Sequence, residues 1–334
     1  MSAPASSSAS AASHPSRLVT ARAPVRLDFG GGWTDVPPYC DEQGGVVCNV
    51  AVARYAVCRL DEAGGHDAEP LSPLAAGALR RLTSEGARPR LRLGSDFPVG
   101  AGLGGSSAAG VATIAALARW RGRELARAEL AEMSRAVETE ELGIAGGRQD
   151  HYAAAFGGAL ELEFGAGADV AVRPILLDDA TRDALERRCL VVYTGESRIS
   201  GRTITAVLDA YRAREPRVTG ALARMRELAQ GMAHALRAGA VDDLGGLVGE
   251  HWAHQRGLDP AIPTPLIDAV IDAARRAGAL GAKALGASGG GCVLAIAAEG
   301  REEPVREAMA ALAEPFDVRV DTGGVHVTDD ERAP

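Results

Sequence analysis

The sequence predicts an α+β fold with two lobes, an N-terminal lobe around a mixed sheet and a helix-rich C-terminal lobe. Two β-rich stretches, 19–29 and 45–60, come before the first long helical pattern. From about residue 200 the chain is mainly helical, until a strand–helix–strand with strands near 292–297 and 316–320. A chain of 334 residues is long for one core. We therefore expect a lobe boundary near residue 180.

Composition limits the class of protein. Residues 1–16 are mostly Ser, Ala and Pro, which predicts a disordered tail, and the two lobes are expected to cover 17–180 and 181–330. The chain shows neither a signal peptide nor an apolar run near the roughly 20 residues of a membrane span. A net charge of −8 argues against nucleic acid as a partner. Five cysteines without Cys-x-x-Cys spacing argue against a metal or disulfide framework, so we expect a cytoplasmic protein.

The remaining elements follow from periodicity and from breaks at glycine. In the N-terminal lobe, we expect a short helix around 74–82, an alternating segment at Leu91 and Leu93, a helix with apolar positions Val111, Ile114, Leu117 and Ala118, a helix near 127–142, and strands around 159–176. A further strand is expected at 189–193, after the lobe boundary. In the C-terminal lobe, we expect helices over 218–237, 240–257 and 265–278.

The run 98–109 carries the strongest functional signal. It reads Pro-Val-Gly-Ala-Gly-Leu-Gly-Gly-Ser-Ser-Ala-Ala and connects a strand to a helix. Glycines let the backbone approach a ligand, and the free N–H groups of the helix attract an anion such as a nucleotide phosphate. The Ser106 and Ser107 hydroxyls can hydrogen-bond or bind Mg²⁺. The candidate phosphate-binding residues are Pro98, Gly100, Ala101, Gly102, Leu103, Gly104, Gly105, Ser106 and Ser107.

Other interpretations of this run are weaker. No lysine follows the glycines, so the run is not a Gly-x-x-x-x-Gly-Lys-Ser/Thr loop. The strand–helix–strand unit with an acidic residue about 20 positions on, typical of dinucleotide binding, is also missing. A tight strand-to-helix turn without a ligand stays an alternative.

Acidic residues that could bind a metal or act as a base follow the glycine run. On a regular helix over 127–142, Glu138 and Glu141 lie on or beside the apolar stripe, and Glu140 points away. A carboxylate entering a buried face needs a partner, which a metal ion can supply, although a solvated helix end is the alternative. Asp150, next to Gly146 and Gly147, is either a turn former or a base for phosphoryl transfer.

Three glycine-rich segments, 30–32, 100–105 and 286–291, resemble the three signature motifs of the GHMP kinases, which include galactokinase, homoserine, mevalonate and phosphomevalonate kinases. The runs 137–143, 147–158 and 193–198 are most similar to the D-glycero-D-manno-heptose 7-phosphate kinases. The motif 31–38, Gly-Gly-Trp-Thr-Asp-Val-Pro-Pro, also resembles the kinase part of L-fucokinase.

The resemblance implies a GHMP kinase fold with a ferredoxin-like C-terminal lobe, and ATP with Mg²⁺ in the cleft between the lobes. It implies that Asp150 and Arg26 are catalytic, with Arg26 near Asp150 and the transferring phosphoryl group, and that Ser107 and Glu138 bind Mg²⁺. Gly289 and Gly290 join the phosphate loop around the nucleotide. The implied substrate residues are Trp33, Thr34, Asp35, Arg148, Gly290 and Arg198.

The implied reaction is ATP-dependent phosphorylation of the anomeric hydroxyl of a heptose 7-phosphate, giving the 1,7-bisphosphate. Galactokinases carry Gly-Glu-His-Thr-Asp where this chain has Gly-Gly-Trp-Thr-Asp, which argues against galactose. His151 replaces the glutamine usual in the heptose kinases, and Ser288 replaces a glycine or alanine. A fucokinase-like kinase of an unphosphorylated sugar and a non-catalytic sugar and nucleotide sensor are the alternatives.

Two further clusters remain open. His251 and His254 stand at i, i+3 and could bind a metal, but no third ligand is in view. The residues Arg198, Arg202, His254 and Arg256 could grip a distal phosphate or form a solvated helix face. Sugar phosphate and ATP are the expected small-molecule partners, with no membrane partner. A homodimer is one option for an oligomeric state that the sequence leaves open.

Overall fold

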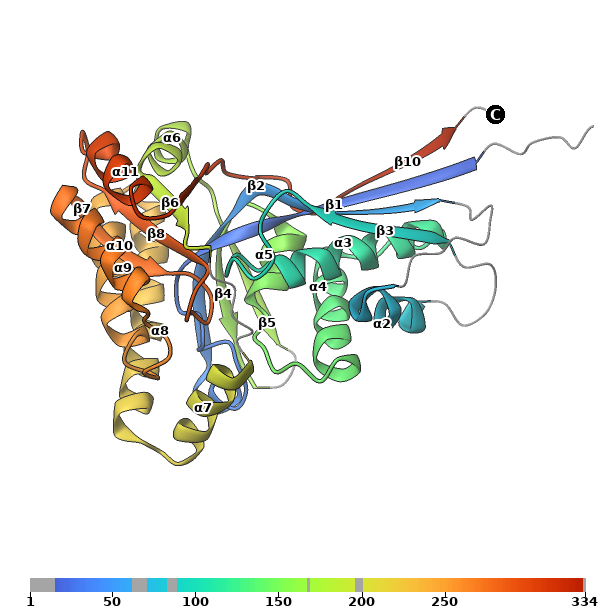
Figure 1. Ribbon diagram of the computed structural model, residues 1–334. Coiled ribbons are helices and arrows are strands. Elements are labelled where there is room, and N and C mark those ends of the chain that lie inside the picture. Colours follow the sequence, from blue (N-terminus) through green and yellow to red (C-terminus); the bar gives the residue numbers. More distant parts are fainter. Residues whose placement is uncertain (1–15, 62–70, 83–88, 167–168, 196–200, 333–334) are drawn as a thin grey trace, which may run out of the picture.

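A computed structural model describes residues 16–61, 71–82, 89–166, 169–195 and 201–332. The predicted tail, except Ser16, thus lies outside the described residues. The fold has two lobes that lie side by side (Figure 1). The α+β prediction is confirmed, and none of the described helices is long and apolar enough to span a membrane.

The N-terminal sheet has strand order β10-β1-β2-β4-β5, with β3 also paired to β2. Its strands are β1 (Ser16–Gly30), β2 (Gly45–Asp61), β3 (Arg90–Ser95), β4 (Ala159–Phe164), β5 (Val170–Ile175) and β10 (His326–Arg332). All the described pairings are antiparallel, so the expected mixed sheet is wrong. Hydrophobic alternation indicates that a strand exists but not the direction in which it pairs.

The C-terminus returns to the N-terminal lobe. Strand β10 pairs with β1 from Arg22 to Ser16. The segment 326–330, which the sequence placed in the C-terminal lobe, therefore lies in the N-terminal sheet. This pairing satisfies the open edge of β1, and no local pattern in the sequence reports such a remote partner.

Helices cover one face of this sheet. They are α2 (Pro73–Leu82), α3 (Gly105–Trp120), α4 (Arg127–Ala136) and α5 (Gln149–Phe156), and the short α1 (Tyr39–Gln43) links β1 to β2. All four predicted apolar positions of α3 are buried. The expected helix near 127–142 is α4 followed by a π-turn, η1 (Val137–Glu141), which changes the direction of the glutamates relative to a regular helix.

The C-terminal lobe has an antiparallel sheet in the order β7-β8-β6-β9. Its strands are β6 (Cys189–Tyr193), β7 (Ala279–Ala284), β8 (Cys292–Ala297) and β9 (Glu314–Phe316). Its helices are α7 (Gly201–Arg212), α8 (Pro216–Arg237), α9 (Val241–Gln255), α10 (Pro265–Ala277) and α11 (Glu302–Ala310), and α6 (Asp179–Arg188), absent from the sequence prediction, leads into β6. This strand order is that of a split βαβ, ferredoxin-like unit, as expected.

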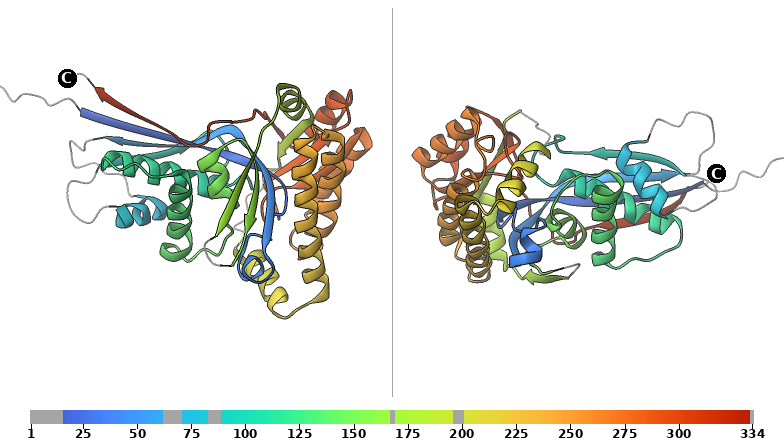
Figure 2. Two further views of the ribbon diagram at one scale, coloured as in Figure 1. Left: turned by 180° about the vertical axis from the view of Figure 1, so that it is seen from behind. Right: turned by 90° about the horizontal axis from the view of Figure 1, so that it is seen from below.

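The lobes share a core. One apolar cluster combines β1 and β2 with Met232 of α8, Val248 of α9 and Leu294 of β8. Helices α8 and α9 run side by side and form the layer between the two sheets (Figure 2). The second cluster fills the C-terminal lobe but includes Trp33 and Tyr39 from the N-terminal lobe. The two lobes are therefore packed together and are not independent domains.

Candidate active site

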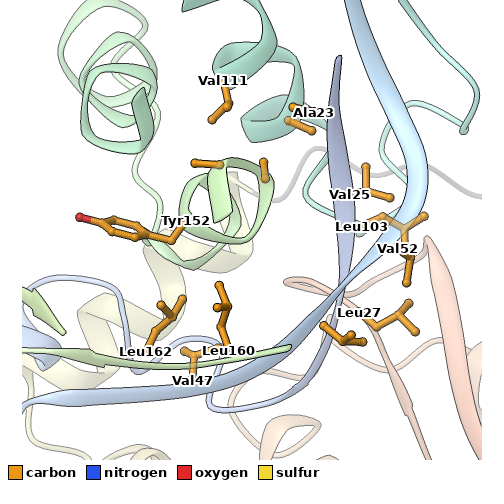
Figure 3. Close-up of a cluster of buried hydrophobic side chains, with 14 of the residues drawn as sticks. Ala23, Val25, Leu27, Val47, Val52, Leu103, Val111, Tyr152, Leu160 and Leu162 are labelled. Atoms are coloured by element: carbon orange, nitrogen blue, oxygen red, sulfur yellow. The ribbon is translucent and has the colours of Figure 1, made fainter. Parts of the chain in front are cut away.

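The second and third glycine segments meet where the lobes join. The amide of Cys292 donates to the carbonyl of Ala101 at 2.8 Å, which ties the third segment to the second. A Cβ on Gly102 would lie 2.6 Å from the carbonyl oxygen of Leu285. The side chain of Leu103 enters the core beside Val25 and Val52 (Figure 3), and its carbonyl accepts from the amide of Arg26 at 3.0 Å. The loop is thereby held on β1 and on the C-terminal lobe.

The N-terminus of α3 has no capping side chain and no acidic residue in its first turn. Gly104, the N-cap residue, has a φ of 76°, and a Cβ there would lie 3.2 Å from Oδ2 of Asp150. Uncapped N–H groups at a helix start attract anionic ligands, and phosphate is the most common of them. The structure therefore supports a phosphate site at 104–107 that faces Asp150.

Arg26 and Asp150 form an ion pair, as the resemblance implies. Nε and Nη2 of Arg26 lie 2.8 and 2.7 Å from Oδ1 of Asp150. Nη1 donates to the carbonyl of Gly102 at 2.7 Å. Arg26 is buried, but the Asp150 side chain is 26% exposed. Burial raises the pKa of Asp150 above its ordinary value, and Arg26 opposes that rise.

Glu138 lies against the phosphate loop. Its Oε1 accepts from the Ser106 hydroxyl at 3.0 Å, and its Oε2 lies 3.0 Å from Nε2 of His151. Ser107 does not contact Glu138 directly but lies 3.3 Å from the same nitrogen. Burial favours the protonated form of Glu138, but the hydrogen bonds from His151 and Ser106 outweigh it and lower the pKa of Glu138.

These residues fit a magnesium ion. The described residues contain no group of three or more His, Cys, Asp or Glu that could hold a metal. Mg²⁺ at nucleotide sites needs fewer protein ligands, usually one or two oxygens beside phosphates and waters. The Glu138 carboxylate and the Ser106 and Ser107 hydroxyls supply hard oxygen donors of that kind.

Asp35 packs on the turn before Asp150. Its Oδ2 accepts from the amide of Gln149 at 3.0 Å, and a Cβ on Gly147 would lie only 1.9 Å from the same oxygen. Burial raises the pKa of Asp35 to about 6, in spite of this amide. Arg148 is buried nearby, with Nε 3.6 Å from Glu132 and with no hydrogen-bond partner for Nε or Nη1 among the described residues.

Trp33 and Thr34 are tied into the protein. Trp33 has a φ of 79° and packs in the C-terminal core, and its indole N–H has no hydrogen-bond partner among the described residues. The Thr34 hydroxyl contacts the carbonyls of Gly31 and Val46 and the amide of Val46. This hydroxyl thus secures the loop, and the structure does not direct it toward a substrate.

The other candidates either have partners elsewhere in the structure or lie outside the described residues. Arg198 lies outside the described residues. Gly289 donates its amide to Ile262, and Ser288 accepts from Gln255. Glu140 and Glu141 pair with Arg81 and Arg80 on the surface. Arg256 pairs with Asp268, and His254 lies 4.0 Å from Glu250, so these two residues face other partners.

Sequence reasoning missed two anchors of the first glycine segment. The ammonium of Lys283 lies 3.0 Å from the Asp28 carbonyl and 3.1 Å from its Oδ2, with both side chains buried. His251 accepts from the amide of Gly31 at 2.9 Å, and burial holds its pKa well below the usual range. This contact leaves no metal role for His251. Lys283 is the sole lysine of the chain, which was the available signal.

Known proteins share this architecture. The GHMP kinases N terminal domain matches residues 73–158, and the GHMP kinases C terminal domain matches residues 232–315. A D-glycero-alpha-D-manno-heptose 7-phosphate kinase from Campylobacter jejuni is 27% identical, over 82% of this chain and 88% of that protein. A bifunctional fucokinase/GDP-fucose pyrophosphorylase from Arabidopsis thaliana is 26% identical over 92% of this chain, which spans 33% of that enzyme.

A solved structure of a sugar kinase has a similar fold. The crystal structure of a D-glycero-D-manno-heptose 1-phosphate kinase from Bacteroides thetaiotaomicron has a TM-score of 0.74 and 26% sequence identity to this chain. The similarity covers 93% of this chain and 98% of that one. Taken with the loop geometry, these matches establish that the chain belongs to the GHMP kinases, ATP-dependent enzymes that phosphorylate small molecules.

Proposed function

We propose that this protein transfers the γ-phosphoryl group of ATP to the anomeric hydroxyl of D-glycero-D-manno-heptose 7-phosphate, giving the 1,7-bisphosphate. The observation that carries the kinase chemistry is the Arg26–Asp150 pair, which lies beside the uncapped N-terminus of α3. The similarity to heptose 7-phosphate kinase supports the substrate class.

In the transfer, the C1 oxygen forms a bond to the γ-phosphorus, and the bond from that phosphorus to the β,γ-bridging oxygen breaks. Asp150 orients the hydroxyl and accepts its proton, and Arg26 stabilises the negative charge that develops on the phosphoryl oxygens. The N–H groups at the start of α3 hold the phosphates of the nucleotide. Glu138 with Ser107 or Ser106 would hold Mg²⁺, which when bound neutralises phosphate charge.

The surroundings of Arg148 favour a phosphorylated sugar as the substrate. Arg148 is buried, and the carboxylate of Glu132, 3.6 Å from its Nε, partly offsets its charge. Two of its nitrogens have no hydrogen-bond partner among the described residues. A buried guanidinium with free donors suits the 7-phosphate of the substrate, because phosphate accepts two parallel hydrogen bonds from arginine.

The second candidate is a fucokinase-like activity on an unphosphorylated sugar. It is favoured by the similarity to the fucokinase/GDP-fucose pyrophosphorylase, which covers 92% of this chain. The test measures ADP release with D-glycero-D-manno-heptose 7-phosphate and with L-fucose, side by side. We expect turnover with the heptose phosphate only. Turnover with fucose alone would keep the catalytic residues but overturn the substrate.

The variant R148M sharpens this test. Methionine keeps the volume of the stem but removes the donors. We expect the KM for heptose 7-phosphate to rise about 30-fold, equivalent to about 2 kcal/mol, with little change in the KM for ATP. An unchanged KM for the sugar would remove Arg148 from the phosphate site.

A further inference from the structure

His151 connects the two predicted magnesium ligands. Its imidazole Nε2 lies 3.0 Å from Oε2 of Glu138 and 3.3 Å from the Ser107 hydroxyl. Its Nδ1 lies 3.0 Å from the hydroxyl of Ser134. The side chain is 1% exposed. One imidazole therefore contacts side chains from α3, α4 and η1, and is itself held by α5.

The hydrogen-bond chemistry places a proton on Nε2 of His151. An ionised carboxylate only accepts, so Nε2 carries the proton and donates it to Glu138. Nδ1 pairs with the hydroxyl of Ser134, which holds the ring in this orientation. Oε1 of Glu138 accepts from Ser106, so each carboxylate oxygen retains a lone pair that can reach a cation.

We propose that His151 is a positioning residue, which sets the orientation of Glu138 and its separation from Ser107 so that both can bind one Mg²⁺. This inference rests on the proposed nucleotide site but holds for any sugar substrate. Partners behind a metal ligand fix its rotamer, and their loss typically weakens metal binding 10- to 100-fold, roughly. The imidazole reaches the reaction only through Glu138 and Ser107.

The surroundings make this role specific. Glu138 stands in a π-turn, where the backbone does not present the side chain in the direction of a regular helix. A carboxylate on such a turn has several rotamers within reach of solvent. Two hydrogen bonds, from His151 and Ser106, hold it toward the N-terminus of α3. Ser106 is exposed and can rotate, so the buried imidazole supplies the constraint.

The experiment compares H151F with H151Q. Phenylalanine keeps the ring volume and removes both hydrogen bonds, and glutamine keeps a donor and an acceptor. H234F, on an exposed position of α8, is the matched control. Isothermal titration measures the affinity for a non-hydrolysable ATP analogue in Mg²⁺ and in EDTA. A second readout is the Mg²⁺ concentration that gives half-maximal ADP release.

For H151F we expect the gain in analogue affinity from Mg²⁺ to fall about tenfold and the half-maximal Mg²⁺ concentration to rise about tenfold. Affinity in EDTA stays within about twofold. H151Q recovers most of the gain, and H234F behaves as wild type. A wild-type Mg²⁺ gain in H151F overturns the role of His151.

The controls separate this role from folding and from the proposed function. Thermal unfolding of each variant shows whether H151F is folded. If it is not, H151L takes its place in the titration: a reduced Mg²⁺ gain supports the role, and a wild-type gain overturns it. If wild-type protein binds no nucleotide, the proposed function itself fails. If wild type binds the magnesium complex and H151F binds it equally well, only the assignment of His151 fails.

Discussion

Two ion pairs start from the same face of β1, two residues apart. Arg26 pairs with Asp150 within the N-terminal lobe, and Asp28 pairs with Lys283 across the lobes. The Asp150 side chain is 26% exposed, whereas those of Asp28 and Lys283 are 3% and 0% exposed. The first pair can meet a ligand and exchange a proton. The second pair is closed to ligands and joins the ends of two strands.

Burial, and not position along the strand, distinguishes the roles of the two ion pairs. Residues i and i+2 of a strand share a face, so alternation alone makes the two pairs equivalent. Burial lowers the pKa of Lys283, although Asp28 opposes that shift. Removing one partner of such a pair leaves an isolated buried charge. The variants below therefore separate a pair that serves chemistry from a pair that serves the fold.

The largest effect is expected from D150N. The amide keeps the size of the side chain but cannot accept a proton, so turnover should fall about a thousandfold, equivalent to about 4 kcal/mol. The melting temperature and the affinity for the ATP analogue should stay close to wild type. Steady-state ADP release and thermal unfolding check both expectations. Unchanged turnover would contradict the role of Asp150 as base.

K283M should lower stability rather than turnover. It leaves the Asp28 carboxylate buried without its partner, so the free energy of unfolding should fall by about 3 kcal/mol. Urea unfolding measures this loss. The double variant D28N/K283M removes the charge as well and should recover more than half of it. If K283M is as stable as wild type, the cross-lobe pair does not hold the fold.

The third effect concerns Asp35, a buried carboxylate that follows the first glycine segment, 30–32. Its pKa in the folded protein is about 6, against 3.8 for the ordinary group. The folded state thus binds the proton more tightly, so stability falls as pH rises from about 4 to 6. Relative to wild type, D35N should gain about 2 kcal/mol between pH 4 and pH 7. Equal pH dependence in urea unfolding would contradict this.

The smallest effect separates two adjacent glycines. In G147A the new Cβ meets Asp35 at 1.9 Å, which forces the turn before Asp150 to shift. We expect a loss of about 1 kcal/mol in stability and a severalfold rise in the KM for sugar. In G146A the nearest atom, Oε2 of Glu138, is 3.9 Å away, so this control should resemble wild type. Identical behaviour of the two variants would show that the contact between Gly147 and Asp35 does not constrain the turn before Asp150.

The sequence by itself determined most of the elements and the order of the motifs. Local patterns depend on neighbours a few residues apart, which is why the helix after the glycine run and the strands β1 and β2 could be predicted. The glycine run and Asp150 indicated phosphoryl transfer, because glycines let the backbone approach a phosphate and a carboxylate can accept a proton. The pairing of Arg26 with Asp150 came from the resemblance to known kinases, and the structure brings the two together.

Only the tertiary structure decided which side chains meet. Lys283 lies 255 residues from Asp28 along the chain, and His151 contacts Ser134 and Glu138 because α5 packs against α4. The return of β10 to β1 and the antiparallel direction of the sheet were also beyond any local pattern. Such contacts follow from long-range packing, in which the whole core selects partners that no short stretch of sequence encodes.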